Sequence, residues 1–210
     1  MKKNSLKIVK MDKTKTLFNY EKKILINELI LKKAYVTSLT QSDSAIIELA
    51  HDARNGNSNN HLDVSHELLK LVAERVEYKP LTTSNETTAI VAYQQKKGVC
   101  QDQAHIMISA ARSIGIPARY VNGYMHNNSH SSEFQSTHAW AEFYIENLGW
   151  VGFDPTNNCS PDERYIRVSC GLDANYAAPI KGVFYGRTNS SGSIEKLKIS
   201  VQTLEYNSQQ

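Results

Sequence analysis

The sequence of 210 residues predicts an α+β fold, in which helices come first along the chain and an antiparallel sheet follows. Two observations carry this prediction. Up to residue 115, apolar residues recur at the spacing of amphipathic helices, whereas after Ile116-Pro117 the pattern changes to the period of two that is typical of strands. The sequence Asn147-Leu148-Gly149, between two such segments, indicates a hairpin turn, which joins antiparallel neighbours.

Four helices are expected in the first part of the chain. Ser42 or Asp43 is placed to cap the first of them, and Gly98 suits the left-handed position that follows the third. The pattern between residues 22 and 36 does not separate helix from strand. The expected helices cover residues 44–54, 64–77, 86–96 and 100–115.

Strands are expected at residues 119–124, 137–145, 150–154, 165–169, 182–185 and 197–203. The second and third of them are the arms of the hairpin. If residues 146–148 form its loop, Ile145 pairs with Gly149, and Asp154 then lies diagonal to His138 on the same face. The two Cβ atoms would be about 7–8 Å apart, within reach of an imidazole–carboxylate hydrogen bond. A one-residue slip would put them on opposite faces.

Composition and charge argue against a nucleic-acid-binding protein, a membrane-spanning protein and a disulfide-stabilised protein. The formal net charge of +3 is too small to indicate a nucleic-acid partner, and no run of about 20 apolar residues indicates a membrane helix. Three cysteines exclude a disulfide framework, because at most Cys159 could pair with Cys170, which leaves Cys100 free. The basic N-terminus lacks the apolar segment of a signal peptide, so a reducing, cytoplasmic setting is expected.

Three side chains form a candidate nucleophile, base and orienting carboxylate. Cys100 lies at a helix start, where the helix dipole and unpaired N–H groups stabilise a thiolate and can bind an oxyanion. His138 could act as its base, and Asp154 could orient the imidazole. Each residue alone has a commoner explanation: an inert buried cysteine, an ordinary strand histidine and an Asp-Pro turn. Because all three explanations would have to hold at once, the sequence favours a catalytic Cys-His-Asp triad.

Four further motifs are residues 98–104 (GVCQDQA), 115–124 (GIPARYVNGY), 138–142 (HAWAE) and 149–156 (GWVGFDPT). In this order they resemble the motifs of the transglutaminase-like superfamily, and in particular its bacterial cysteine-peptidase-like branch. The resemblance implies a papain-like core, in which the nucleophile helix packs on an antiparallel β-sheet, with Cys100, His138 and Asp154 as the triad. The resemblance is good from about Tyr78 to Gly186 and weaker before it. We expect a catalytic domain over residues 41–206 and an N-terminal extension over residues 1–40, which could be the remnant of an upstream domain.

Two positions depart from the superfamily pattern and could reshape the substrate side of the site. Gln103 stands where relatives usually carry an aromatic residue, and residues 171–174 (GLDA) stand where many relatives read Gly-Arg-Asp-Tyr. The resemblance further implies that Tyr78 could lend its hydroxyl to the oxyanion, as an upstream aromatic does in related enzymes, although a packed tyrosine is the commoner case.

Three more residues have weaker indications. Trp140 shares the His138 face and could lie on the substrate side, where it would shield the Cys-His pair from water, although ordinary core packing explains it equally well. Asp102 is favourable at the start of the nucleophile helix and is expected to be structural. Arg119 could anchor a carboxylate, which the sequence does not identify.

The leading interpretation is a cysteine-dependent acyl-transfer enzyme, which hydrolyses peptide or amide bonds of a protein or peptide substrate through a thioester at Cys100. The thioester could instead pass to an amine, as in a transglutaminase that cross-links glutamine to amines. A non-catalytic transglutaminase-like binding module is the alternative from another class. His126 and His130 have the spacing of zinc ligands but lie in a poor helix former, so no metal or other cofactor is expected. The sequence identifies neither the natural substrate nor the oligomeric state.

Overall fold

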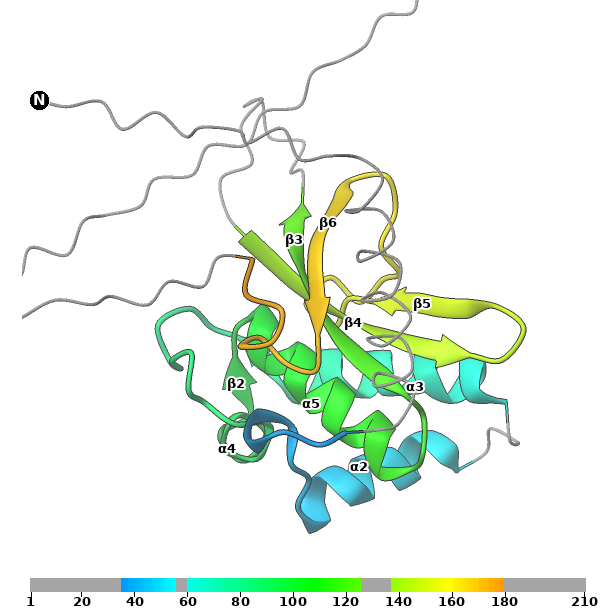
Figure 1. Ribbon diagram of the computed structural model, residues 1–210. Coiled ribbons are helices and arrows are strands. Elements are labelled where there is room, and N and C mark those ends of the chain that lie inside the picture. The colour runs from blue at the N-terminus through cyan, green and yellow to red at the C-terminus, as the bar shows by residue number, and fades with distance from the viewer. Residues whose placement is uncertain (1–34, 56–59, 126–136, 180–210) are drawn as a thin grey trace, which may run out of the picture.

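A computed structural model of the chain describes residues 35–55, 60–125 and 137–179 (Figure 1). Four strands form one antiparallel sheet in the spatial order β5-β4-β3-β6, while β1 and β2 form a short parallel pair. The α+β class with an antiparallel sheet is thereby confirmed. The elements are η1 (Ser38–Thr40), α2 (Ser44–Arg54), α3 (His61–Arg75), β1 (Glu77–Tyr78), α4 (Ala89–Gln95), β2 (Lys97–Gly98), α5 (Cys100–Ser113), β3 (Ala118–Met125), β4 (Thr137–Ile145), β5 (Gly149–Phe153) and β6 (Tyr165–Gly171).

Helix α5 is the central element of the fold. It packs against β3 and β4 of the sheet, and α2, α3 and α4 pack around it (Figure 1). Every residue from Asp102 to Arg112 is buried, as expected of a helix that is covered on all sides. The core between helix and sheet joins Ile106 and Met107 to Phe143, all without solvent exposure. The element that begins with Cys100 is therefore held rigidly against the sheet.

The predicted helices occur, with shifts at their ends. Helix α2 has the predicted bounds, and the Asp43 side chain caps it by accepting from the Ile46 N–H. Helix α3 begins earlier than predicted because Asn60 caps it, and α4 begins later because Thr88 does. The left-handed residue after α4 is Lys96, with φ of 55°, and not Gly98 as predicted.

The predicted register of the hairpin is confirmed. Ile145 pairs with Gly149, and Ala141 pairs with Phe153 at the far end of β5. Asp154 is the next residue after β5, so its side chain lies on the face opposite to the core residue Phe153 and on the same face as His138. The backbone turns away at this point, since Asp154 forms an isolated bridge with Cys159.

The ends of the described ranges bear on the expected domain bounds. Thr40 in η1 is buried, and its hydroxyl accepts a hydrogen bond from Arg112 of α5 at 2.7 Å. Residue 40 thus packs on the core, and the expected bounds of 1–40 and 41–206 stay a prediction. The predicted strands at 182–185 and 197–203, together with His126 and His130, lie outside the described residues. Within the described ranges, no helix has the length and apolar character needed to cross a membrane.

Candidate active site

Cys100 is the first residue of α5, and its position is fixed by Asp102. The Asp102 carboxylate accepts hydrogen bonds from the Val99 N–H at 2.8 Å and from the Thr83 hydroxyl at 2.6 Å. Burial raises the pKa of Asp102 above its ordinary value, against the effect of both hydrogen bonds. Gly98 is required here because a Cβ at this position would lie 2.7 Å from the Cβ of Asp102. Asp102 therefore has the structural role expected for it.

Cys100 and His138 line the same pocket, which has a volume of about 360 Å³. Cys100 is half-buried, whereas His138 is buried. Apart from this pair, the described lining residues include no Asp, Glu, Lys or Arg side chain. Four carboxamide side chains line the pocket instead, at Asn85, Gln101, Asn122 and Asn175.

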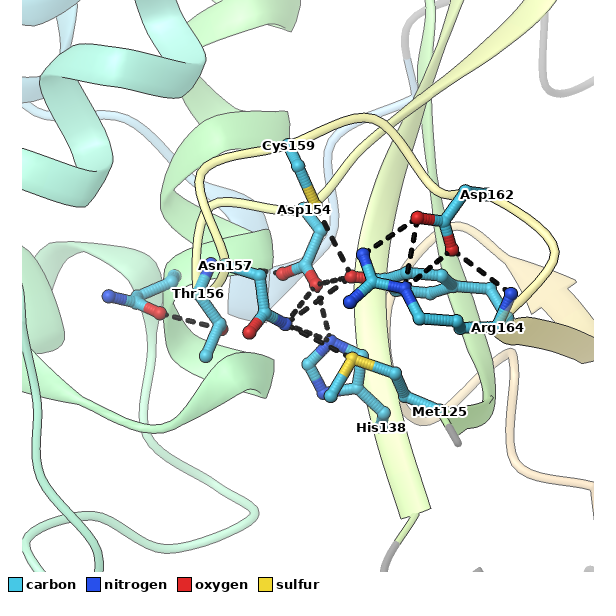
Figure 2. A network of polar contacts seen from close by, with 10 residues as sticks. Met125, His138, Asp154, Thr156, Asn157, Cys159, Asp162 and Arg164 are labelled. Carbon is cyan, nitrogen blue, oxygen red and sulfur yellow. Dashed lines mark hydrogen bonds and ion pairs between the residues drawn. The ribbon is translucent and has the colours of Figure 1, made fainter. Parts of the chain in front are cut away.

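His138 and Asp154 form a buried hydrogen-bonded pair. The distance from His138 Nε2 to Asp154 Oδ2 is 2.7 Å, and the carboxylate has no solvent exposure (Figure 2). Because Asp154 occupies Nε2, Nδ1 is the ring nitrogen that remains for Cys100. The structure thus brings together the three residues that the sequence singled out.

The charges around His138 favour its protonated form. Burial lowers the pKa of His138, but hydrogen bonds and charge interactions with Asp154 and Cys100 outweigh this effect and raise the pKa from 6.5 to about 9. An imidazolium at this position can donate a proton to a leaving amine at neutral pH.

This raised pKa predicts how stability depends on pH. The folded protein retains a proton on His138 that the unfolded chain releases near pH 6.5, so the stabilisation is complete below about pH 6.5 and is lost as the pH rises through about 9. We expect the free energy of unfolding of wild type, minus that of His138→Gln, to be constant below pH 6.5 and to fall by about 3 kcal/mol by pH 10. Urea titrations across this range measure it. A difference already lost by pH 7.5 would contradict the raised pKa.

Asp154 has further partners that the sequence analysis missed. Its Oδ2 accepts from Asn157 Nδ2 at 2.6 Å and from the Tyr165 hydroxyl at 2.7 Å, and its Oδ1 accepts from the Thr156 N–H at 3.0 Å (Figure 2). Burial raises the pKa of Asp154, but the hydrogen bonds with His138, Asn157 and Tyr165 leave this pKa below its ordinary value. The contact with Thr156 is a local Asx turn, which the sequence Asp-Pro-Thr-Asn could have indicated.

A model of the transglutaminase-like superfamily matches residues 47–155, about half of the chain. The chain belongs to this superfamily. An uncharacterized protein of Mycobacterium leprae is 38% identical over 117 residues, which cover 54% of this chain and 41% of that protein. A protein-glutamine gamma-glutamyltransferase of Pseudomonas aeruginosa is 28% identical over 109 residues, 48% of this chain and 16% of that enzyme.

Among solved structures, a candidate cysteine protease from Cytophaga hutchinsonii has a TM-score of 0.60 and 29% identity, covering 71% of this chain and 49% of its own. This likeness bears out the transglutaminase-like, papain-like fold. The chain spans less than half the length of each of these relatives.

The two departures from the superfamily pattern have different outcomes. Gln103 is buried and donates to the Val76 carbonyl at 2.7 Å, while its Oε1 accepts from the Thr156 hydroxyl at 2.7 Å. It is not one of the described pocket residues, so its visible role is to tie α5 to the turn that holds Asp154. Of residues 171–174, in contrast, Ala174 lines the pocket together with Cys100 and His138, and an effect on substrate binding stays a prediction.

The pocket wall after β6 is attached to α5 by two buried side chains. The Ala174 N–H donates to His105 Nε2 at 3.1 Å, and Arg112 donates to the Leu172 carbonyl at 2.8 Å. Burial lowers the pKa of His105 to about 4, so the ring is neutral and its nitrogen can accept. The sequence analysis gave no role to His105.

Trp140 lies behind His138. The indole is buried, with its centroid 6.3 Å from the His138 ring in a stacked orientation and 5.5 Å from the Tyr165 ring edge-on. Gly123, opposite His138 on β3, makes room for it, because a Cβ there would lie 2.7 Å from the indole. Trp140 is not among the described pocket residues, so the substrate-side role stays a prediction.

Tyr78 and Arg119, two further residues singled out in the sequence, both lie outside the described pocket lining. Tyr78 pairs with Gly98 in the short parallel ladder and is half exposed. It is also absent from the described residues that line the pocket, and its oxyanion role stays a prediction. Arg119 does anchor a carboxylate, that of Glu142, at 2.6 Å in a buried ion pair, and it stacks on the Trp150 ring.

All three cysteines are free thiols. The Cys159–Cys170 bridge that the sequence allowed does not form. Cys159 Sγ lies 3.4 Å from the Tyr165 hydroxyl, whereas Cys170 is exposed on β6.

Proposed function

We propose that the protein is a cysteine-dependent acyl-transfer enzyme that hydrolyses peptide or amide bonds through a thioester at Cys100. The observation that carries the proposal is the arrangement of Asp154, His138 and Cys100 in a chain, with the last two at one pocket. The raised pKa of His138 supports it, because that pKa depends on both of the other members. The substrate class is protein or peptide, in keeping with the carboxamide-lined pocket.

The first half of the reaction forms the thioester. The Cys100 sulfur attacks the carbonyl carbon while its proton is held by His138, and donors at the start of α5 bind the oxyanion. His138 then gives the proton to the departing amine as the C–N bond breaks. Asp154 accepts from Nε2 throughout, so the proton that moves is the one on Nδ1.

In the second half, His138 takes a proton from water, and the oxygen attacks the thioester carbonyl. The C–S bond breaks, the carboxylic acid leaves and the Cys100 thiol is restored. If an amine attacks in place of water, the product is a new amide. The similarity to a protein-glutamine gamma-glutamyltransferase makes this transfer the second candidate.

The fraction of the thioester that reacts with water and the fraction that reacts with an amine are measured with β-casein and dansylcadaverine. We expect cleaved or deamidated casein to form with less than about a tenth as much dansylcadaverine incorporated, since water is present in large excess and the visible pocket offers no acidic side chain for an amine. Incorporation equal to the ammonia released would instead assign a transglutaminase. The absence of any turnover, including with small esters, would favour the non-catalytic binding module.

A further inference from the structure

The loop between β1 and α4 carries an exposed leucine in an unfavourable backbone conformation. Leu81 is 100% exposed, and its φ is 63°. This left-handed region suits glycine and asparagine, while a bulky side chain is strained there. A side chain left wholly in water gains nothing from burial within the fold. Neither backbone geometry nor internal packing therefore explains a leucine at this position.

Hydrogen bonds hold the loop directly beside Cys100. The Lys79 N–H donates to the Gly98 carbonyl at 2.7 Å, two residues before the cysteine. The Thr83 hydroxyl donates to Asp102 at 2.6 Å, two residues after it. Leu81 is midway between these anchors, and its Cα lies within about 8 Å of the Cα of each anchored loop residue.

The same loop forms part of the pocket mouth. Asn85 lines the pocket, and its backbone carbonyl accepts a hydrogen bond from Gln101 Nε2 at 3.4 Å. At the other end of the loop, Tyr78 is 50% exposed and pairs with Gly98. We call residues 78–85 the rim loop. Asn85 thus joins the rim loop, with its exposed Tyr78 and Leu81, to the pocket that contains Cys100.

We propose that the rim loop is a docking surface for the peptide substrate, with Leu81 receiving an apolar side chain next to the residue that reacts with Cys100. The inference rests on the proposed function and adds to it a preference of the enzyme for an apolar substrate residue next to the one that reacts. A polypeptide whose reacting carbonyl enters the pocket beside the rim loop would pass its neighbouring residues over Leu81. Contact with an apolar side chain would cover the leucine surface that the fold leaves in water.

Two peptides test the proposal. They are identical hexapeptides in which either leucine or serine flanks a central glutamine on both sides, and their consumption is followed by mass spectrometry, which registers cleavage, deamidation and transfer alike. We expect wild type to prefer the leucine peptide about tenfold in kcat/KM, through a lower KM. In Leu81→Gly and Leu81→Asn the ratio should fall to about one, while the melting temperature is unchanged or higher, because both residues accept the left-handed conformation.

Leu148→Gly is the matched control. Leu148 is 61% exposed in the β4–β5 turn, at the opposite end of β4 from His138, and its variant should keep the wild-type preference. A preference that survives in both Leu81 variants, or wild type with no preference, would overturn the docking role alone. A change in self-association without a change in the ratio would assign the surface to a second copy and would also overturn it. Wild type inert toward both peptides and casein would overturn the proposed function as well.

Discussion

Replacing Cys100 with alanine is expected to lower kcat for peptide hydrolysis by about 10⁴- to 10⁶-fold. The variant retains the pocket and the His138–Asp154 pair, but no sulfur remains to form the thioester. Cys100 is only half-buried at the start of α5, so we expect the melting temperature to change by only a few degrees. Rates of casein or peptide hydrolysis, together with thermal unfolding, measure the two effects separately.

Cys170→Ala is the matched control for this variant. Cys170 is an exposed thiol on β6 and is not one of the described pocket residues, so its removal should leave the hydrolysis rate unchanged. If Cys100→Ala kept more than about a hundredth of the wild-type rate, the nucleophile would have to be another group.

Replacing Asp154 with asparagine is expected to lower kcat by about 10³- to 10⁴-fold. Three donors converge on Asp154 Oδ2 and one on Oδ1, so the amide oxygen should take the Oδ2 position. His138 then keeps a hydrogen bond but loses the negative charge, and its pKa falls from about 9. The Thr156 N–H also loses its acceptor.

The NMR titration of His138 distinguishes this electrostatic effect from a misfolded variant. We expect a folded spectrum with the pKa of His138 lowered by more than one unit. Asp162→Asn is the control, because Asp162 lies in the same loop and pairs with Arg164 at the surface. A variant at Asp154 that retained both the wild-type rate and the wild-type pKa of His138 would remove Asp154 from the triad.

The hairpin shows what local sequence rules can predict. The alternation along β4 and the length of the turn place Asp154 on the His138 face, and both are properties of one short segment. The start of α5 is equally local, because Gly98 and Asp102 act within one turn of Cys100. The bounds of α2 follow in the same way from Asp43 and the spacing of its apolar residues.

The parts that were missed depend on contacts between distant segments. Tyr165 reaches Asp154 because β6 pairs with β3, with a register shift between Asn122 and Gly123 that no pattern in the sequence marks. Gln103 joins the end of α3 to the turn after β5. Its two hydrogen-bond partners can be identified only when the positions of both segments are known. His105 likewise acquires its role from the segment after β6, almost seventy residues later.

The left-handed residue after α4 differs from the one that the sequence predicts. Lys96, not Gly98, takes the left-handed position after α4, and its ammonium group lies 3.4 Å from the centroid of the Tyr93 ring. Gly98 is instead needed for the close approach of Asp102. A glycine near a helix end can thus serve a steric requirement of the next helix.

Trapping the acyl-enzyme would show directly whether Cys100 is the nucleophile. The protein is mixed with the leucine-flanked glutamine peptide, quenched in acid within the first turnovers, digested and mapped by mass spectrometry. If Cys100 is the nucleophile, an acyl group that hydroxylamine removes will be found on Cys100, with none on Cys159 or Cys170 and none in Cys100→Ala. Turnover with an acyl group on a different residue, or with no covalent intermediate at any quench time while Cys100→Ala remains active, would contradict it.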